Sequence, residues 1–156
     1  MIKKIIKFQP KAIFFDWDNT LVNNWNPIFI SYKKTLKELG LKKQNKKEIL
    51  RNAKYSLRET FPKVFKNDWV KAKEIFYKIF KEIHLKEIKP IANAEKILKI
   101  IKNKKLFCGV ISNKDGNLLR KEIDKLKWKK YFQVIVGANE AKKDKPSKYP
   151  FNLALK

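Results

Sequence analysis

Short apolar runs alternate with amphipathic segments over the second half of the 156-residue chain, and this alternation is its strongest fold signal. The runs at 106–111 and 132–136 have the length and composition of buried strands. The segments that follow Pro90 and Asn117 carry apolar residues at helical spacing instead. Strands that alternate with helices form a parallel sheet with right-handed crossovers, so we expect an α/β protein with a Rossmann-like sheet.

The first half of the chain contributes one more strand and a helical region. Residues 11–16 form an apolar run that ends in a polar turn, as a buried strand does. A helical insertion from about residue 27 to 89 would lie over the carboxyl ends of the strands, where open α/β sheets bind ligands. The sequence predicts helices that begin at Asn26 and Asp68, a helix over 49–57, a link over 60–67, and a later helix that begins at Pro90 and turns Ala94, Ile97, Leu98 and Ile101 inward.

The chain carries a net charge of +24 at pH 7, which raises the question of a nucleic-acid partner. Nearly all of its basic residues are lysine, and arginine occurs only at Arg51, Arg58 and Arg120. Specific base and phosphate recognition relies on arginine, so its scarcity argues against specific binding of nucleic acid. We expect weak, salt-sensitive binding to polyanions, and a basic binding module stays open as an alternative function.

One cysteine and one histidine restrict the setting of the protein and its metal chemistry. Cys108 cannot form an internal disulfide, and Cys108 and His84 cannot supply a zinc site between them. The apolar run at 12–15 is too short for the core of a signal peptide, and no later run could span a membrane. We therefore expect a cytoplasmic protein with no membrane partner.

Asp16 and Asp18 stand two residues apart in the turn that follows the first predicted strand. In a tight turn, this spacing lets both carboxylates face one small volume. Oxygen ligands suit Mg²⁺, and a carboxylate bound to Mg²⁺ can attack phosphorus. The spacing alone also fits an ordinary acidic turn, but it does not fit an EF-hand loop, whose twelfth position would fall on Pro27.

Polar residues also follow the ends of the other two predicted strands. Ser112 and Asn113 end the second strand, and Lys145 follows the third. A hydroxyl and backbone N–H groups can hold phosphate oxygens, and an ammonium balances the negative charge of carboxylates and phosphate. Taken singly, Ser112 fits a strand-end cap and Lys145 is one of many lysines, but their order along the chain indicates a phosphate site at one edge of the sheet.

These three segments resemble the motifs of the haloacid dehalogenase superfamily. Phe-Phe-Asp16-Trp-Asp18-Asn-Thr-Leu-Val is similar to the first motif, Val-Ile-Ser112-Asn-Lys to the second, and Lys145-Pro-Ser to the third. Asn19 stands where the family often has glycine, and asparagine tolerates the left-handed backbone that glycine would adopt there.

The resemblance implies the organisation of the chain, in particular that of phosphoglycolate-phosphatase-like members with an α-helical cap. Residues 11–22 and 88–156 would form the α/β core, and residues 23–87 would form the cap, which excludes water and selects the substrate. We expect four aromatic residues of the cap region to belong to its apolar core rather than to contact substrate, namely Trp25, Tyr55, Phe61 and Trp69.

The resemblance also implies a function, that of a Mg²⁺-dependent phosphatase acting on a small phosphorylated metabolite. Asp16 would attack phosphorus and become an aspartyl phosphate, while Asp18 would protonate the leaving group and then activate water. Mg²⁺ would be held by Asp16 and by the backbone carbonyl of Asp18. Ser112, Asn113 and Lys145 would hold the transferring phosphoryl group.

The family's fourth motif, an acidic pair at the end of a fourth strand, has no match before Lys156, and neither Glu140 nor Asp144 is expected to replace it. The resemblance implies that this fourth strand pairs beside the first, so 12–15 would form an apolar edge open to another chain. We therefore expect a C-terminally incomplete chain with three alternatives. The first is that the chain is a fragment or one half of a split Mg²⁺-dependent phosphatase, with a complementary C-terminal fragment or a second copy in a homo-oligomer as its partner. The second is a catalytically inactive remnant, and the third is the polyanion-binding module.

Overall fold

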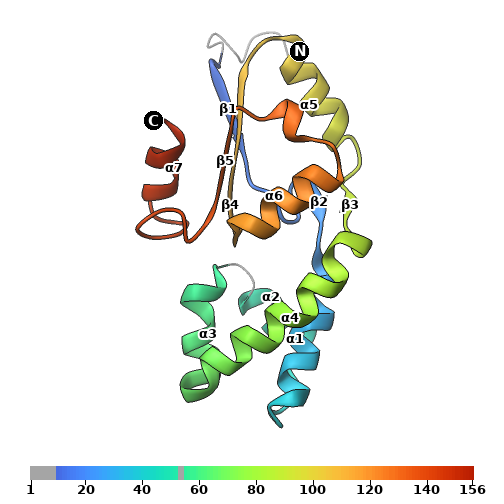
Figure 1. The fold of residues 1–156 in the computed structure, drawn as a ribbon, viewed down its shortest axis with the longest axis vertical. Helices are drawn as coiled ribbons and strands as arrows, with labels where there is room; N and C mark the ends of the chain where they lie inside the picture. The colour runs from blue at the N-terminus through green and yellow to red at the C-terminus, as the bar shows by residue number, and fades with distance from the viewer. Residues whose placement is uncertain (1–9, 53–54) are drawn as a thin grey trace, which may run out of the picture.

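The computed structural model describes residues 10–52 and 55–156, and within these ranges the main sheet has three parallel strands in the order β1-β4-β5 (Figure 1). Ala12 of β1 lies beside Phe107 of β4, and Val110 of β4 lies beside Ile135 of β5. The expected α/β fold with a parallel sheet is confirmed. The strands are β1 (Ala12–Phe15), β4 (Phe107–Asp115) and β5 (Val134–Ala138).

Alternate residues of each strand point to opposite faces of the sheet, so apolar side chains lie on both faces. Helices cover both of these faces. Ile13 and Phe15 pack into the apolar cluster that includes residues of α5 and α6, whereas Phe14 packs into the cluster on the side of α7. Figure 1 shows α7 on one side of the sheet and the other two helices on the opposite side. The helices are α5 (Ala94–Asn103), α6 (Gly116–Lys125) and α7 (Tyr149–Ala154).

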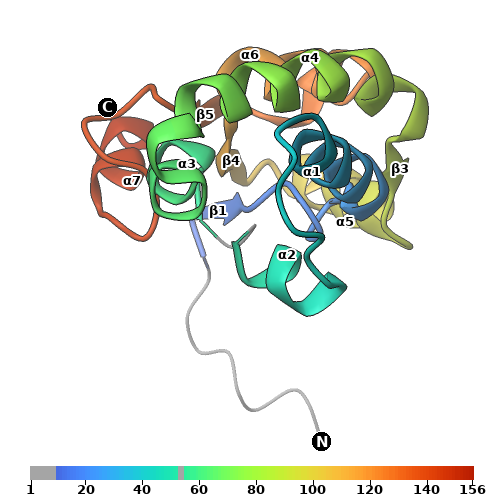
Figure 2. The ribbon, with the colours of Figure 1, turned by 90° about the horizontal axis from the view of Figure 1, so that it is seen from below.

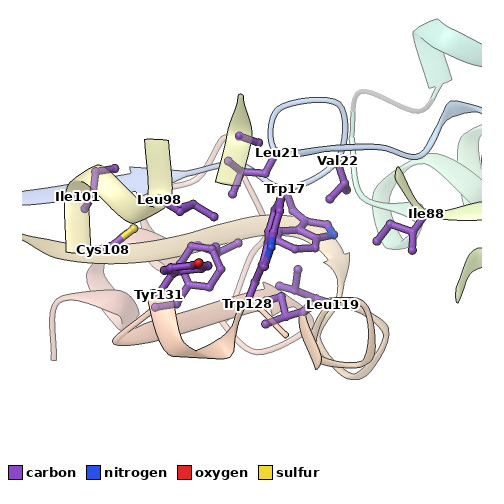
Figure 3. Packing of buried hydrophobic residues seen from close by; sticks show 14 residues of the cluster. Trp17, Leu21, Val22, Ile88, Leu98, Ile101, Cys108, Leu119, Trp128 and Tyr131 are labelled. Carbon is purple, nitrogen blue, oxygen red and sulfur yellow. The ribbon is translucent and has the colours of Figure 1, made fainter. Parts of the chain in front are cut away.

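The larger of these two clusters is built around two tryptophans. Trp17 is fully buried directly after β1, and its ring meets that of Trp128 edge to face at a centroid distance of 5.9 Å. Leu98 and Leu119 bring α5 and α6 into the same cluster (Figure 3). The burial of Trp17 anchors the turn that carries Asp16 and Asp18, because the residue between them belongs to the core.

Four α-helices beyond the carboxyl ends of the strands form a second apolar cluster (Figures 1 and 2). They are α1 (Trp25–Glu38), α2 (Lys46–Asn52), α3 (Leu57–Phe65) and α4 (Trp69–Glu87), with a 3₁₀ turn, η1 (Lys66–Asp68), before α4 and another, η2 (Lys129–Tyr131), before β5. The chain enters and leaves this helical region through two short antiparallel strands, β2 (Val22–Asn23) and β3 (Lys89–Pro90). The sequence did not predict this two-stranded connection.

The expected link over 60–67 is wrong, because most of it is helical. Helix α3 ends at Phe65 and contains Pro62, and Leu57, assigned to the preceding helix, starts α3 instead. A proline inside a helix removes one backbone hydrogen bond and favours a break. Here Phe61 and Phe65 lie one helical turn apart, both buried, with ring centroids 4.8 Å from each other. Their burial outweighs the local signal of Pro62.

Three other expectations also need correction. Pro90 belongs to β3, and the helix after it begins only at Ala94. Ile97 is 45% exposed, although Ala94, Leu98 and Ile101 are buried as expected. Strand β4 continues past Ser112 to Asp115, with a register irregularity after Ile111. The periodicity located the elements, but the packing of neighbouring elements decided where each begins and ends.

Two further observations concern the sheet edge and the membrane. Among the residues that the structure describes, β1 pairs only with β4 and so lies at an edge of the sheet, as the family resemblance implied. No helix in the described ranges is long and apolar enough to cross a lipid bilayer.

Candidate active site

The turn after β1 is closed by backbone hydrogen bonds around Trp17. The Trp17 carbonyl accepts from the N–H groups of Leu21 at 3.0 Å and Val22 at 3.3 Å. Asn19 adopts a left-handed backbone with φ of 63°, which confirms that asparagine is tolerated where the resemblance implied glycine. This tight turn holds Asp16 and Asp18 at one edge of the sheet while Trp17 points into the core.

Asp16 forms an ion pair with Lys145 across the carboxyl ends of two strands. The Lys145 Nζ lies 2.7 Å from Asp16 Oδ1 and also donates to the Ile111 carbonyl at 2.6 Å. The side chain of Asp16 is 42% exposed and that of Lys145 is 31% exposed, so ligands can reach this pair. The residues predicted from two separate motifs therefore lie together.

Asn113 holds the backbone of Lys145 in place. Its side-chain Oδ1 accepts from the Lys145 N–H at 2.9 Å, and its Nδ2 donates to the Lys145 carbonyl at 3.0 Å. Ser112 is buried, and its Oγ accepts from the backbone N–H of Lys114 at 3.1 Å. Asn113 thus holds the loop that carries the Lys145 ammonium. The sequence had placed Asn113 at the end of a strand without indicating this contact.

Asp18 points toward a different lysine. Its Oδ1 accepts from Asn24 Nδ2 at 2.6 Å and lies 2.8 Å from Lys114 Nζ. Burial raises the pKa of Asp18 above its ordinary value, and the charge of Lys114 opposes this rise. Both contacts go to Oδ1, so Oδ2 is the oxygen that can carry a proton.

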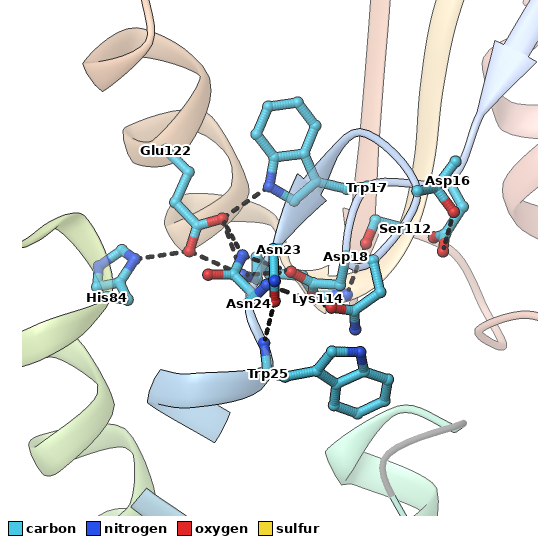
Figure 4. A network of polar contacts seen from close by, with 12 residues as sticks. Asp16, Trp17, Asp18, Asn23, Asn24, Trp25, His84, Ser112, Lys114 and Glu122 are labelled. Atoms are coloured by element: carbon cyan, nitrogen blue, oxygen red, sulfur yellow. Dashed lines mark hydrogen bonds and ion pairs between the residues drawn. The ribbon is translucent and has the colours of Figure 1, made fainter. Parts of the chain in front are cut away.

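Asn24 and Lys114 belong to a buried polar network centred on Glu122 of α6 (Figure 4). Glu122 Oε2 accepts from Trp17 Nε1 at 2.7 Å and from Asn24 Nδ2 at 2.9 Å. Lys114 Nζ reaches both carboxylate oxygens of Glu122, at 2.7 and 2.8 Å. His84 of α4 lies 2.7 Å from Glu122 Oε1 through its Nδ1, which must carry the hydrogen because an ionised carboxylate only accepts.

The charges in this network stabilise one another. Burial alone would raise the pKa of Glu122, but Lys114, His84 and Trp17 hold that pKa below its ordinary value. Burial would likewise lower the pKa of Lys114, yet Asp18 and Glu122 raise it. Glu122 is therefore ionised and Lys114 protonated, and the network connects Asp18, in the turn after β1, with His84 in the helical region.

Sequence reasoning missed the members of this network other than Asp18. Lys114 directly follows Asn113, so the second motif itself contained it. Glu122 occurs among Leu118, Leu119 and Ile123 on the apolar face of a predicted helix, where an unpaired charge would be costly. A glutamate at such a position is the signal that could have revealed a buried ion pair, although it does not reveal the partner.

A cavity of about 400 Å³ lies between the sheet edge and the helical region. It is lined by all five residues that the sequence predicted for the site, Asp16, Asp18, Ser112, Asn113 and Lys145. Trp25 and Tyr55 also line it, so the expectation that they belong to the apolar core is wrong. Phe61 and Trp69 do pack into the core of the helical region, as expected.

The two acidic residues that follow β5, Glu140 and Asp144, form ion pairs with arginines. Asp144 is buried, and its Oδ1 accepts from Arg58 Nη2 at 2.9 Å and from the Asn139 N–H at 3.0 Å. Glu140 pairs with Arg120. In the described part of the chain, no three His, Cys, Asp or Glu side chains gather as a metal-binding cluster. Any metal at this edge would need oxygen atoms from the backbone, water or a ligand.

Comparisons with known proteins agree with this geometry. A sequence model of the haloacid dehalogenase-like hydrolase family matches residues 13–156. A phosphoglycolate phosphatase of Aquifex aeolicus is 31% identical over 144 residues, which cover 90% of this chain and 66% of that protein. The chain thus spans slightly less than two thirds of the length of this relative.

Solved structures share the fold. The haloacid dehalogenase-like family protein SP0104 of Streptococcus pneumoniae superposes with a TM-score of 0.82 at 22% identity, covering 94% of this chain and 69% of that one. A superfamily hydrolase of Ehrlichia chaffeensis superposes with a TM-score of 0.59 at 25% identity, covering 94% of this chain and 71% of the other. Sheet and helical region together therefore follow a known architecture.

Proposed function

Because the chain belongs to the haloacid dehalogenase-like hydrolase family, we propose that it contributes the active site of a phosphatase that acts on a small phosphorylated metabolite. The single observation that carries this proposal is the ion pair of 2.7 Å between Asp16 and Lys145, with Asp18 two residues away at the same cavity. A nucleophilic carboxylate, an acid and a cation for the phosphoryl group are the parts that such a reaction needs.

In the proposed first step, an oxygen of the Asp16 carboxylate attacks phosphorus and forms an aspartyl phosphate. The bond between phosphorus and the ester oxygen breaks, and a proton on Asp18 Oδ2 passes to that oxygen as the alcohol leaves. The raised pKa of Asp18 supports this role, because an acid must hold its proton near the pH at which it works.

In the second step, water attacks the phosphorus of the aspartyl phosphate. Asp18, now ionised, accepts a proton from that water, and the bond from phosphorus to Asp16 breaks to release phosphate and the free carboxylate. Lys145 balances the negative charge on Asp16 and on the phosphoryl oxygens throughout, while Ser112 and Asn113 shape the phosphoryl site.

Mg²⁺ is the cofactor that we propose for this site. It commonly binds through one or two carboxylates together with water and phosphate oxygens, so the exposed Asp16 carboxylate fits its requirements. The Asp16 carboxylate and the Asp18 backbone carbonyl would hold the ion. When bound, Mg²⁺ would neutralise part of the charge on the phosphoryl group.

The experiment measures phosphate release from an aryl phosphate by the 156-residue chain, with Mg²⁺ and with chelator. We expect Mg²⁺-dependent release that Asp16→Asn abolishes. Asp68→Asn serves as the matched control, because Asp68 is an exposed aspartate of η1 that does not line the cavity. Circular dichroism of both variants would show that the fold is kept.

Other outcomes separate the alternatives. Release only after a complementary C-terminal segment is added, or only from an oligomer, would identify a split site. A folded chain that releases no phosphate under any of these conditions contradicts the proposal and leaves an inactive remnant. Tight polyanion binding at physiological salt that Asp16→Asn does not change would favour the basic binding module instead.

A further inference from the structure

The part of the cavity wall that α1, α4 and α6 contribute is apolar and largely aromatic. Helix α1 contributes Trp25, Ile28 and Tyr32, helix α4 contributes Phe76 and Phe80, and α6 contributes Leu118. A leaving group attached to a phosphoryl group at the sheet edge would extend toward this wall, because the same cavity contains both. The chemistry of the wall therefore indicates which alcohols the site accepts.

The aromatic rings of this wall are held in place by stacking. The rings of Phe76 and Phe80 stack at 5.6 Å with an interplanar angle of 12°, and His84 continues the row on Phe80 at 5.0 Å. Trp25 stacks on Phe29 at 5.6 Å and 19°. Rings that are already ordered lose little entropy on binding. Phe76 and Phe80 are only 4% and 3% exposed, so the half-buried ring of Trp25 offers more of its surface to a flat ligand.

The cations that line the cavity are already paired. Lys145 lies against Asp16 at 2.7 Å, and Lys114 is buried between Asp18 and Glu122. Among the described lining residues, no other lysine or arginine occurs, and the remaining charged one is Asp115. A carboxylate on the leaving group would therefore meet an apolar wall and a like charge, which is unfavourable.

The polar atoms among the ring-bearing residues are uncharged. The Tyr32 hydroxyl accepts from Asn52 Nδ2 at 3.0 Å, and burial raises the pKa of Tyr32 to about 12. Burial also raises the pKa of Tyr77, and the negative charges of Asp115 and Asp144 raise it further. Both phenols stay neutral near pH 7 and can hydrogen-bond to an uncharged hydroxyl or carbonyl group.

We propose that the site accepts phosphate monoesters whose leaving group is an uncharged alcohol or phenol with a flat, apolar body, and that it disfavours leaving groups that carry a carboxylate. This inference rests on the proposed phosphatase function, because it assumes that the phosphoryl group binds between Asp16 and Lys145. It also separates this chain from the substrate named for its Aquifex aeolicus relative, since phosphoglycolate carries a carboxylate.

The test compares three phosphonates, in which a carbon atom bonded to phosphorus stands in place of the ester oxygen, so that no turnover occurs. Benzylphosphonate presents an aromatic ring, 3-phosphonopropionate presents a carboxylate, and methylphosphonate fills the phosphoryl site alone. Calorimetry with Mg²⁺ measures their dissociation constants. We expect benzylphosphonate to bind at least about tenfold more tightly than methylphosphonate, and 3-phosphonopropionate to bind no more tightly than methylphosphonate.

A charge introduced into the wall sharpens the test. Trp25→Lys removes one ring and adds a cation beside the cavity. We therefore expect this variant to bind benzylphosphonate more weakly and 3-phosphonopropionate more tightly than the wild type does. Val70→Lys is the matched control, because Val70 is 49% exposed on α4 and does not line the cavity. It should leave all three constants unchanged.

The outcomes distinguish this inference from the function on which it rests. Equal binding of the three phosphonates, or tighter binding of 3-phosphonopropionate than of benzylphosphonate, overturns the substrate class but leaves the phosphoryl site intact. Failure of all three to bind to folded protein in the presence of Mg²⁺ overturns the phosphatase proposal, and the substrate class with it.

Discussion

Asp16 and Asp18 each meet a lysine ammonium, at 2.7 Å from Lys145 and 2.8 Å from Lys114, but the two pairs lie in different surroundings. The side chains of the first pair are 42% and 31% exposed. In the second pair, Asp18 is 22% and Lys114 only 5% exposed, and Lys114 also contacts the buried Glu122. Nearly identical distances therefore describe two different electrostatic situations.

The surroundings decide what each pair can do. An exposed ion pair contributes little to stability and can exchange its partner for a phosphate oxygen. A buried pair cannot lose one member without leaving an uncompensated charge, so it fixes the position of its neighbours. Under the proposed function, the Asp16–Lys145 pair would be the reactive part of the site, and the network around Glu122 would position Asp18.

The largest expected effect is that of Lys114→Met. Removal of this ammonium leaves the carboxylates of Glu122 and Asp18 without their cation, and we expect the free energy of unfolding to fall by about 3–5 kcal/mol. Urea denaturation followed by circular dichroism measures this loss. A change as small as that of a surface substitution would contradict the contrast between the two pairs.

Glu122→Gln should lower the free energy of unfolding by about 2–3 kcal/mol at pH 7, because Lys114 and the other donors lose a charged acceptor. The pKa of Glu122 is lowered in the folded protein, so its contribution is present above its unfolded pKa of about 4.3 and is lost as pH falls through the folded value. The difference in stability between wild type and variant should therefore shrink at acidic pH. Glu82→Gln on the exposed face of α4 is the control and should show no such trend.

His84→Phe should lower the free energy of unfolding by less, about 1–2 kcal/mol at pH 7. The new ring can keep the stacking on Phe80, and only the hydrogen bond from His84 Nδ1 to Glu122 is lost. A double-mutant cycle with Glu122→Gln measures how much this hydrogen bond depends on the charge of Glu122, because the glutamine oxygen can still accept from Nδ1. Strict additivity of the two substitutions would show that the charge of Glu122 does not strengthen its contact with His84.

The smallest change in stability is expected for Lys145→Met, about 0–1 kcal/mol in the same urea experiment. Its ammonium is partly exposed, so water can replace the contact with Asp16. Phosphonate binding should nevertheless be lost, because the variant removes the cation of the proposed phosphoryl site. A loss of stability as large as that of Lys114→Met would show that exposure does not separate the two pairs.

Much of the fold could be predicted because its signals are local. The apolar run before Asp16 and the periodicity of α1, α4 and α6 depend on neighbours a few residues away. Helix α3 could not be predicted in the same way, since Pro62 disfavours it locally and only the burial of Phe61 and Phe65 among other helices favours it. Local propensity yields to tertiary packing there.

The order of strands, helices and motifs along the chain was enough to predict the parallel α/β fold and the five polar residues at one sheet edge. The partners of Asp18 and the apolar wall of the cavity depend instead on contacts between segments that are distant in the sequence. Glu122 is separated from Trp17 by 105 residues and from Asn24 by 98, so no local pattern relates them. Periodicity shows that a side chain is buried, but folding selects the groups against which it is buried.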